Sequence, residues 1–589
     1  MNEAMNKIMK HMSIAALALT GALMSSCATD DDIIENAPQV ASTETAKKDN
    51  IVVVTTTVTR GDNQTKALNI DYMAQTLTKT FAVDEKMSLQ YINTSDEKVK
   101  AVSNPLTEGD ITNDGKTAKL TFTLVNPKEN CQVKFIYPAA MAGDDGNADF
   151  SKLSSQYGTL SSLGSSLDLT EATGSMAGYD LPENVTMNNS CAIIAFTPKN
   201  AGGTEDISSD ITQFTVSDGT NTYTVNRPAV GGTIFVAMQP ISSRDLTYTA
   251  TAGGKTYKKF VSNKTYAAGN FYQQGLRMGE LVDLSTLTDD YDAKNGDVLT
   301  GTLAGNYSID IAHGATVTLD NVNINGNGTW AGDHSGIECQ GNATIILKGE
   351  NVVKGFSNIF AGISATNTSC TLTIDGDGSL TASSKDSGAG IGGIDSGDCA
   401  NIVINGGTIN ATGGPNGGAG IGGGNNAACG NITINGGNVR AQGGSFAAGI
   451  GCGSYLTGKK KICGDITING GYVTAQGGAA SAGIGSCYGY GDGECSCGNI
   501  IITGGTIEAT GGYHTFDATQ YCGAGIGSGA TAGCGTITIA NTVTRVKASR
   551  GGESAKSIGA GTEGTCGTVT IGGTVYADGI AESPYTYQP

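Results

Sequence analysis

The fold of the C-terminal half is decided by the stretch CGNITINGGNVRAQGG at residues 429–444. A short variable segment follows it and leads to AGIG at 448–451. The same unit returns as CGDITINGGYVTAQGG at 463–478, with AGIG at 482–485. A unit of this length that contains only strand and turn signals predicts stacked β coils, in which each coil pairs with its neighbours.

Each repeat unit begins at a cysteine, which gives the period of the coils. The unit cysteines stand at positions 370, 399, 429, 463, 497, 534 and 566, so the spacing varies between 29 and 37 residues. The variation falls in the segments on either side of AGIG. We therefore expect a regular scaffold whose inserts differ from coil to coil.

Side-chain alternation within one unit predicts which residues form the interior. Ile432 and Ile434 should point inward and Thr433 outward, because successive strand residues face opposite sides. Val439 and Ala441 repeat this pattern, and Ile450 follows in a third strand. The pairs at 436–437 and 443–444 are predicted to be positive-φ glycine corners. Stacking should align the Ile, Ala, Asn and Cys positions into ladders.

The β-helix is expected to span residues 281–580, with degenerate coils over 283–369 and a C-terminal tail over 581–589. Strand-like runs at 315–319 and 343–347, with Gly-Ile steps near 336 and 362, favour this extension. The pattern resembles extracellular β-helix modules that bind carbohydrate and are similar in shape to pectate lyases. That resemblance implies a right-handed parallel β-helix, and a fold does not by itself give a function.

Residues 51–280 are predicted to be all-β. Short β-branched runs alternate with turn-forming Asn, Asp, Gly and Pro. No amphipathic stretch long enough for a helix is present, and a pair of β-sandwiches fits the size. The expected strands are 51–59, 119–125, 132–137, 192–196, 213–216, 222–225, 233–238 and 246–250.

The order of motifs in this region resembles the fimbrillin (Mfa-like) family of surface lipoproteins. The matching segments are an early strand closing on Thr59-Arg60, FIYP at 135–138, IAFTP at 194–198, GTIFVAMQP at 232–240 and YAAGNFY at 266–272. The resemblance implies two transthyretin-like sandwiches and a role in fimbriae or adhesion.

Family members that polymerise are cut after an arginine near the first strand, which opens a groove for a strand of the next subunit. By that resemblance Arg60 is the candidate processing site. The alternative is that Arg60 lies in a solvated turn before Gly61. A stalk subunit donates its C-terminal segment, so an appendage of this size favours a fimbrial tip or surface decoration.

The N-terminus resembles a lipoprotein signal peptide, expected over residues 1–26. A basic segment at 7–11 precedes a short apolar run at 14–23, and LMSSC at 23–27 resembles a lipobox. Cys27 would then carry the lipid anchor. Residues 27–50 form a polar tether with acidic residues at 30–35, similar to the export signal of surface lipoproteins. We expect an outer-membrane, lipid-anchored and surface-exposed protein, with a periplasmic location as the alternative.

Composition limits the partners. Lys and Arg number 35 against 54 Asp and Glu, giving a net charge of -19. A polyanion of this kind disfavours nucleic acid and anionic lipid surfaces as partners.

Glycine is abundant, with 88 of 589 residues, and many of these glycines lie in loops such as GAGIGG at 388–393. These loops recur in every unit without a following helix. They are therefore predicted to be coil corners and not dinucleotide sites. Neither a cofactor nor a metal is predicted.

The fifteen cysteines leave two interpretations open. Seven occupy one repeated position, which favours an inward ladder of small apolar side chains. Disulfides are the alternative, with Cys452–Cys487 and Cys131–Cys191 as candidate pairs.

The candidate ligand-binding residues lie in the inserts of two adjacent coils. Aromatic rings near carboxylates suit stacking on sugar rings and hydrogen bonding to their hydroxyls. The alternative is that these rings only cover the coil edge. The candidates are Tyr488, Tyr490, Asp492 and Glu494 in one insert and Tyr513, His514, Phe516 and Tyr521 in the next.

Together these patterns predict a surface-displayed, non-catalytic adhesin whose β-helix binds glycan or host-matrix ligands. A fimbrial tip or accessory subunit that docks by strand exchange is the first alternative. A polysaccharide lyase or hydrolase is the second, and it is disfavoured because outward strand positions are mostly Thr, Asn and Gln, with Arg440, Glu508 and Lys547 as the charged exceptions.

Overall fold

A computed structural model describes residues 49–60, 69–71, 76–78, 80–227, 231–325, 334–454, 461–489 and 495–589. The chain divides into two compact units, 1–50 and 51–589, and the second is described below. Strands dominate it, and the one α-helix among the described residues, α1, spans only Leu160–Ser162. The all-β prediction is confirmed.

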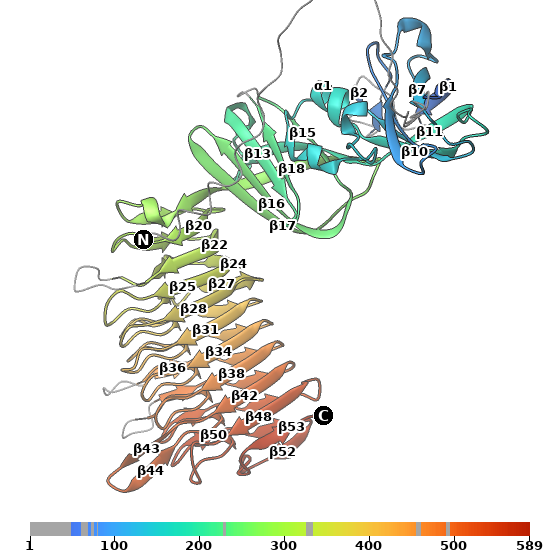
Figure 1. The fold of residues 1–589 in the computed structure, drawn as a ribbon. Helices are drawn as coiled ribbons and strands as arrows, with labels where there is room; N and C mark the ends of the chain where they lie inside the picture. The colour runs from blue at the N-terminus through green and yellow to red at the C-terminus, as the bar shows by residue number, and fades with distance from the viewer. Residues whose placement is uncertain are drawn as a thin grey trace, which may run out of the picture. The chain divides into compact units, whose positions relative to one another are not determined.

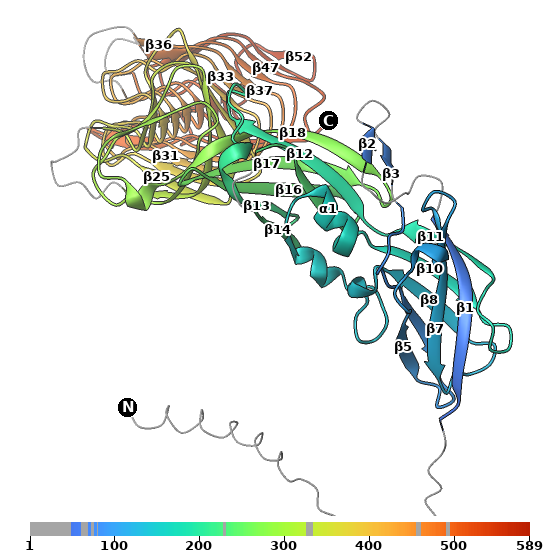
Figure 2. The same ribbon diagram turned by 90° about the horizontal axis from the view of Figure 1, so that it is seen from above.

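The first sandwich lobe is built around β1, which lies antiparallel to β7 and parallel to β11 (Figure 2). Alternation along β7 buries Leu120, Phe122 and Leu124, and the Phe122 and Phe135 rings meet edge to face at 6.3 Å. Aromatic packing of this kind stabilises a small core beyond the area it buries. The sheet order is β5 (Lys98–Val102), β4 (Ser88–Ile92), β8 (Gln132–Tyr137), β10 (Thr170–Ser175), β11 (Asn184–Asn189), β1 (Ile51–Arg60), β7 (Thr117–Val125), β6 (Ile111–Thr112). A separate pair is β2 (Asn69–Asp71) with β3 (Thr76–Thr78).

The second lobe has its own core, in which the rings of Phe196, Phe214 and Tyr248 lie 5.2–6.4 Å apart. Its strands are β9 (Ser155–Gln156), β12 (Ala192–Asn200), β13 (Ile211–Ser217), β14 (Thr222–Asn226), β15 (Ile234–Met238), β16 (Ile241–Ala252), β17 (Lys255–Tyr266) and β18 (Phe271–Asp283). Short helical turns lie at Glu108–Asp110, Ala139–Met141, Phe150–Ser154, Leu163–Leu167, Ser208–Asp210 and Leu284–Thr286.

One strand belongs to both the second lobe and the β-helix. β18 runs parallel to β12 as far as Met278, and from Leu281 it pairs with Val298 of the first coil. The domain boundary expected at residue 280 therefore falls inside a strand. The two regions share a backbone ladder and are not joined by a loose linker.

The C-terminal half is a parallel β-helix (Figure 1). Its first series of strands is β20 (Val298–Thr302), β22 (Ala315–Ile324), β24 (Ala343–Lys348), β27 (Thr371–Gly376), β30 (Asn401–Ile404), β33 (Ile432–Ile434), β37 (Ile466–Ile468), β41 (Ile500–Ile502), β47 (Ile537–Ile539) and β51 (Val569–Ile571). The second is β25 (Glu350–Lys354), β28 (Ser379–Ser383), β31 (Thr408–Thr412), β34 (Asn438–Gln442), β38 (Tyr472–Gln476), β42 (Thr506–Thr510) and β48 (Arg545–Ser549).

Two further series complete the coils. One is β19 (Tyr291–Ala293), β21 (Ile309–Ile311), β23 (Ile337–Cys339), β26 (Ile363–Ala365), β29 (Ile391–Gly392), β32 (Ile421–Gly422), β35 (Ile450–Gly451), β39 (Ile484–Gly485), β45 (Ile526–Gly527) and β49 (Ile558–Gly559). The other, on four coils, is β36 (Lys461–Cys463), β40 (Cys495–Cys497), β46 (Gly533–Cys534) and β50 (Thr565–Cys566).

Register between coils confirms the predicted interior. Ile432 pairs with Ile402 and Ile466, so that like residues stack on each other. Ile434, Val439, Ala441 and Ile450 are all buried. The amides form a ladder outside, since Asn435 donates to Asn405 at 2.8 Å and Asn469 donates to Asn435 at 2.9 Å. Along these strands, backbone and amide donors thus find partners in the neighbouring coil.

The prediction for the glycine corners is only partly correct. Of the four glycines, Gly437 has positive φ (87°), whereas Gly436, Gly443 and Gly444 do not. They are needed for a different reason, which is close approach. A Cβ on Gly444 would lie 1.8 Å from the carbonyl oxygen of Gly414 in the neighbouring coil.

The chain end closes the helix. β52 (Thr574–Tyr576) folds back antiparallel on β51, and β53 (Tyr585–Tyr587) pairs antiparallel with β48. The predicted tail at 581–589 thus contains a paired strand. A reversed strand ends the parallel stack and covers part of the last coil, which limits edge-to-edge association.

Candidate functional site

The insert that carries four of the predicted ligand-binding residues forms a β-hairpin. β43 (Tyr513–Phe516) and β44 (Thr519–Cys522) pair with His514 opposite Tyr521 (Figure 1). The turn residues Asp517 and Ala518 both have positive φ, at 45° and 67°. This is the geometry of a two-residue turn whose twist matches that of the strands. The hairpin therefore positions its rings by backbone pairing.

Rings from three inserts meet beside this hairpin. The Phe446 ring lies 5.3 Å from Tyr488 and 5.1 Å from His514, and Tyr488 lies 5.8 Å from Tyr521. The backbone N–H of Tyr488 donates to the Phe446 carbonyl at 3.2 Å. Phe446 adopts a positive φ of 60°, an uncommon conformation for a bulky residue. Phe446 is not predictable from composition because its insert, residues 445–447, holds no second aromatic residue.

The two interpretations of these rings apply to different residues. Phe446, Tyr488, His514 and Tyr521 are half-buried against one another and cover the coil edge. Tyr513 and Phe516 are 62% and 56% exposed. Rings this exposed cover little of the coil and are available to a ligand. We call these six residues, Phe446, Tyr488, Tyr513, His514, Phe516 and Tyr521, the hairpin patch.

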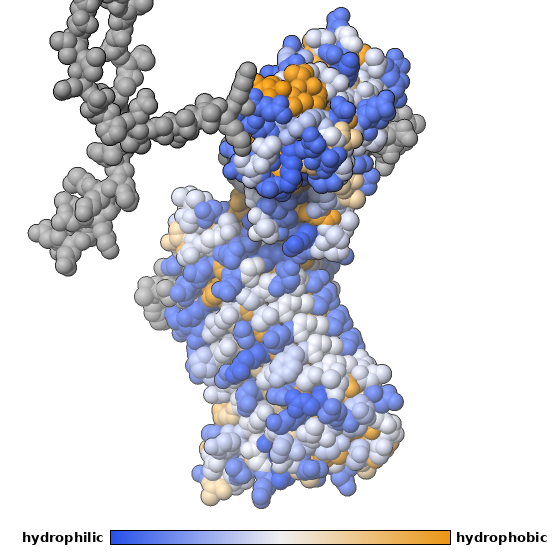
Figure 3. Space-filling model, turned by 45° about the vertical axis from the view of Figure 1, so that its right-hand side comes forward, coloured by the Kyte–Doolittle hydropathy of each residue, from blue (hydrophilic) through white to orange (hydrophobic). Residues whose placement is uncertain are grey.

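The face of the β-helix that Figure 3 shows is mostly hydrophilic or neutral, with apolar residues in small separate areas. The hairpin patch thus combines exposed ring faces with hydroxyl and imidazole groups, which can pack on apolar sugar faces and bond to hydroxyls. Tyr490, Asp492 and Glu494 lie outside the described residues.

The structure corrects the candidate disulfides. Cys487 is bonded to Cys495, with a sulfur–sulfur distance of 2.12 Å, and not to Cys452. Cys131 and Cys191 do not form a disulfide with each other. The Cys131 sulfur lies 3.5 Å from that of Met176, an apolar packing contact. The spacing of the sequence could not show that Cys487 faces its own insert and not the adjacent coil.

The cysteine ladder is present. The sulfurs of Cys399 and Cys429 lie 2.8 Å apart, and Cys463, Cys497, Cys534 and Cys566 align through parallel strands. Burial raises the pKa of the Cys429 and Cys497 thiols well above its usual value, which keeps them protonated. No group of three His, Cys, Asp or Glu side chains in the described part of the chain is placed to hold a metal ion.

Arg60 lies in the core of the first lobe, so its placement in a solvated turn is wrong. It is 3% exposed, and its Nη1 lies 3.2 Å from Asp168 Oδ2. The guanidinium sits 4.5 Å and 4.3 Å from the ring centroids of Phe81 and Tyr137. Burial lowers the pKa of Arg60 to about 10 and raises that of Tyr137 to about 12. Processing after Arg60 stays a prediction, and residues 61–68 lie outside the described ones.

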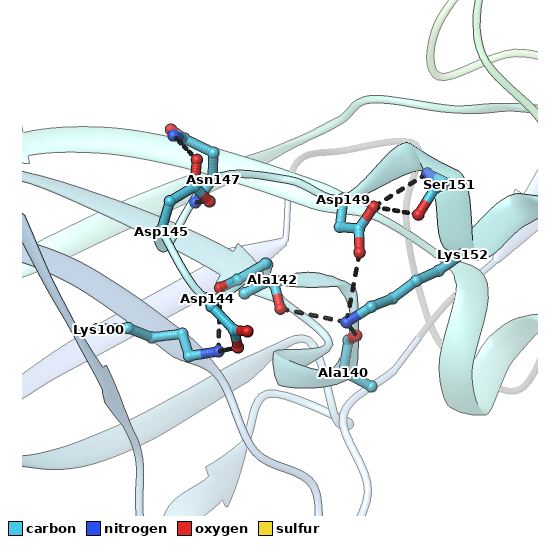
Figure 4. Close-up of polar contacts among 10 residues, drawn as sticks. Lys100, Ala140, Ala142, Asp144, Asp145, Asn147, Asp149, Ser151 and Lys152 are labelled. Carbon is cyan, nitrogen blue, oxygen red and sulfur yellow. Dashed lines mark hydrogen bonds and ion pairs between the residues drawn. The ribbon is translucent and has the colours of Figure 1, made fainter. Parts of the chain in front are cut away.

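The loop that follows β8 gathers acidic side chains, but its contacts are local (Figure 4). Lys152 Nζ donates to the carbonyls of Ala140 and Ala142 and lies 3.9 Å from Asp149. Lys100 lies 3.5 Å from Asp144, and Asp145 accepts from the backbone N–H of Asn147. Each carboxylate contacts a residue of the loop or of the adjacent strand, so we interpret this cluster as structural.

Cys27 and the acidic residues at 30–35 lie outside the described residues, so the lipid anchor stays a prediction. In the part of the chain that the structure describes, no helix has the length and apolar character needed to cross a membrane.

Comparison with known proteins gives a family match within the β-helix. The beta helix repeat model matches residues 372–397, 402–425, 432–454, 466–490 and 500–530, so each matched segment falls within one repeat unit. No curated protein is found with a similar sequence.

Among solved structures, the chain is similar to a fimbrial assembly protein from Parabacteroides distasonis, at 11% identity over 38% of this chain and 91% of that chain, with a TM-score of 0.23. It is also similar to a protein from Bacteroides ovatus described as a "putative cell adhesion protein", at 11% identity over 39% of this chain and 95% of that chain, with a TM-score of 0.24.

Proposed function

We propose that the chain is a surface-exposed, non-catalytic adhesin that binds glycan or host-matrix ligands through the hairpin patch. The observation that carries this proposal is the pairing of a half-buried ring cluster with two strongly exposed rings. The cluster fixes the hairpin, and Tyr513 and Phe516, 62% and 56% exposed, present their faces to a ligand. Exposed aromatic rings cost free energy in water, so a patch of them marks an interaction surface.

The rest of the chain supports display. The second lobe and the β-helix share the strand β18 and form a continuous paired scaffold. The lipobox-like segment ending at Cys27 would anchor it to the outer membrane, with the tether at 27–50 holding the lobes away from the lipid. The acidic charge of -19 suits a soluble surface protein.

A binding screen tests the proposal. The full chain is applied to a glycan array and to immobilised collagen, fibronectin and mucin. We expect binding that falls at least tenfold in the double variant Tyr513→Ala/Phe516→Ala and is unchanged in Tyr157→Ala, an equally exposed (69%) tyrosine of the second lobe. Failure of the wild-type chain to bind any probe would overturn the proposal, and release of unsaturated sugars from a bound polymer would favour the lyase alternative.

A fimbrial tip or accessory subunit is the second candidate. It is favoured by the outer end of β1, where Ile51 and Val53 are 62% and 64% exposed on a strand that begins the folded unit. An exposed apolar strand end suits docking by strand addition. The test is N-terminal sequencing of the protein in surface extracts, where a chain that starts at Gly61 supports this candidate and a chain that starts at Cys27 opposes it.

A further inference from the structure

Two neighbouring coils bring a pair of cysteines into contact near the start of the regular repeats. Cys399 and Cys429 face each other across a parallel bridge, and the backbone N–H of Gly430 donates to the Cys399 carbonyl at 3.1 Å. Their sulfurs lie 2.8 Å apart, and the two thiols are not bonded to each other in this structure. Neither residue belongs to the hairpin patch.

The contact between these two sulfurs is closer than packing alone gives. Nonbonded heavy atoms pack at about 3.5–4.0 Å, and the sulfurs of Cys131 and Met176 in the first lobe lie 3.5 Å apart. A sulfur–sulfur bond is about 2.05 Å long. The distance of 2.8 Å between Cys399 and Cys429 therefore lies between a packing contact and a bond.

The backbone at this pair has the spacing that a disulfide needs. Neighbouring strands lie about 4.8 Å apart, and the Cα atoms of disulfide-bonded cysteines are usually about 4.4–6.8 Å apart. Because Cys399 and Cys429 are bridge partners, their side chains leave the backbone on the same side. A bond can therefore form by rotation of the two side chains, without movement of either coil.

The contacts of the neighbouring thiols favour this pair over the next one along the ladder. The Cys429 thiol is hydrogen-bonded to that of Cys399. In the following coil, the Cys463 thiol is hydrogen-bonded to that of Cys452. A bond between Cys429 and Cys463 would require both thiols to leave these contacts, whereas a bond between Cys399 and Cys429 keeps the partners that are already in place.

Burial determines when such a bond can form. Cys399 and Cys429 are 1% and 4% exposed, and burial raises the pKa of the Cys429 thiol well above its usual value. Thiol–disulfide exchange needs a thiolate and access to the oxidant. Both thiols therefore react slowly once the coils have closed. A bond made while the coils assemble is then shielded from reductants in the solvent.

We propose that Cys399 and Cys429 form an inter-coil disulfide as the chain folds, and that this bond stabilises the first regular coils. The oxidant is a disulfide of a protein or of a small molecule. One cysteine thiolate attacks it and displaces a thiolate, and the second cysteine then attacks the mixed disulfide and displaces the other. The two cysteines lose two electrons and two protons, which the oxidant takes up as it becomes two thiols. The bond requires an oxidising compartment, as the predicted export would provide, and does not depend on what the hairpin patch binds.

The test is a thiol count on the full chain isolated, without reductant, from cells that export it. The protein is unfolded in N-ethylmaleimide, which blocks free thiols, and digested with trypsin. Cleavage after Lys385 and Arg440 gives peptide 386–440, whose only cysteines are Cys399 and Cys429. We expect this peptide to carry no maleimide, and to gain two groups after reduction and a second labelling. Peptide 129–134, which contains Cys131, should carry one group and serves as the control for oxidation during handling. One or two maleimide groups on peptide 386–440 before reduction would overturn the proposal.

Cys399→Ala tests the effect of the bond on the coils, and Cys370→Ala is its matched control. Both substitutions remove a buried sulfur, since Cys370 is 6% exposed, but only the first removes a member of the pair. In proteins isolated without reductant, we expect hydrogen exchange in β30 and β33 to be at least tenfold faster in Cys399→Ala than in Cys370→Ala. The difference should vanish when both variants are folded in reductant. Equal exchange rates without reductant, or a difference that persists in reductant, would contradict a stabilising bond at this pair.

Discussion

The sandwich lobes and the β-helix reach a dry interior by different means. The lobes use large rings in unique contacts, such as Phe196 with Phe214 and Tyr248. The helix interior from β27 onward uses Ile, Leu, Val, Ala and Cys, each stacked on its equivalent in the next coil. In the lobes each core residue therefore makes contacts that no other residue repeats. In the helix the contacts of one unit recur in the next. The inserts of the helix can vary because the repeats already satisfy the backbone.

The largest effect expected from this difference is in the first lobe, at Arg60. Arg60→Ala removes a guanidinium that packs on two rings and lies 3.2 Å from the buried carboxylate of Asp168. Removing one partner of a buried ion pair costs about 3–5 kcal/mol. We expect hydrogen exchange to accelerate in β1, β7 and β11 while the coils beyond β27 keep their protection.

The matched control for that variant is Lys128→Ala, which breaks an ion pair with Asp96 whose side chains are 51% and 72% exposed. It should cost less than about 1 kcal/mol. If the two substitutions lowered the free energy of unfolding by the same amount, the buried ion pair would not be what stabilises the lobe.

A somewhat smaller effect is expected from a side chain placed between two coils. In Gly420→Val, the new Cβ would meet the backbone N of Gln442 at 2.6 Å and the carbonyl oxygen of Gly449 at 2.7 Å. Overpacking of this kind costs about 1–3 kcal/mol. Gly109→Val is the control, because the nearest atom to its Cβ, Thr107 Oγ1, is 3.9 Å away. Urea unfolding of both variants should show a lower midpoint only for Gly420→Val, and a matching drop in the control would point to a general cost of replacing glycine.

The smallest effect is expected when the same substitution is made at two equivalent positions of one ladder. Ile434→Val and Ile468→Val each remove one buried methylene from adjacent rungs of the same ladder. Each should cost about 1 kcal/mol. Urea unfolding that gives the two variants the same loss of stability would confirm that the coils are equivalent, and losses that differ by more than about 0.5 kcal/mol would contradict it.

The sequence predicts the helix better than the lobes, for a physical reason. Residues 429–444 show the inward set directly, because the period of two within strands is repeated in every unit. β17 was not predicted in the second lobe, since KTYKKFVSNKTY at 255–266 carries lysines on a half-exposed sheet face and shows no alternation. Its place is set by pairing with β16, which is a long-range contact.

The candidate site was predictable only in part. Aromatic composition identified the hairpin residues Tyr513, His514, Phe516 and Tyr521, because they are concentrated in one insert. Composition could not show that Phe446 from another coil would complete the cluster, since that depends on the register of the stack. The burial of Arg60 was also invisible, because its partner Asp168 is 108 residues away.

We propose that the repeats form a scaffold and that the hairpin insert carries recognition. Replacing residues 513–522 with Ala-Ser would shorten this unit from 37 to 29 residues, the length of the first unit. The Gly523 N–H already donates to the Gly512 carbonyl at 2.8 Å, so the scaffold can close without the hairpin. The measurement is the affinity of this variant for the glycan or matrix probe that the wild-type chain binds. We expect an unchanged melting temperature with binding lost, whereas full binding by the folded, hairpin-free chain would contradict the assignment of recognition to the hairpin.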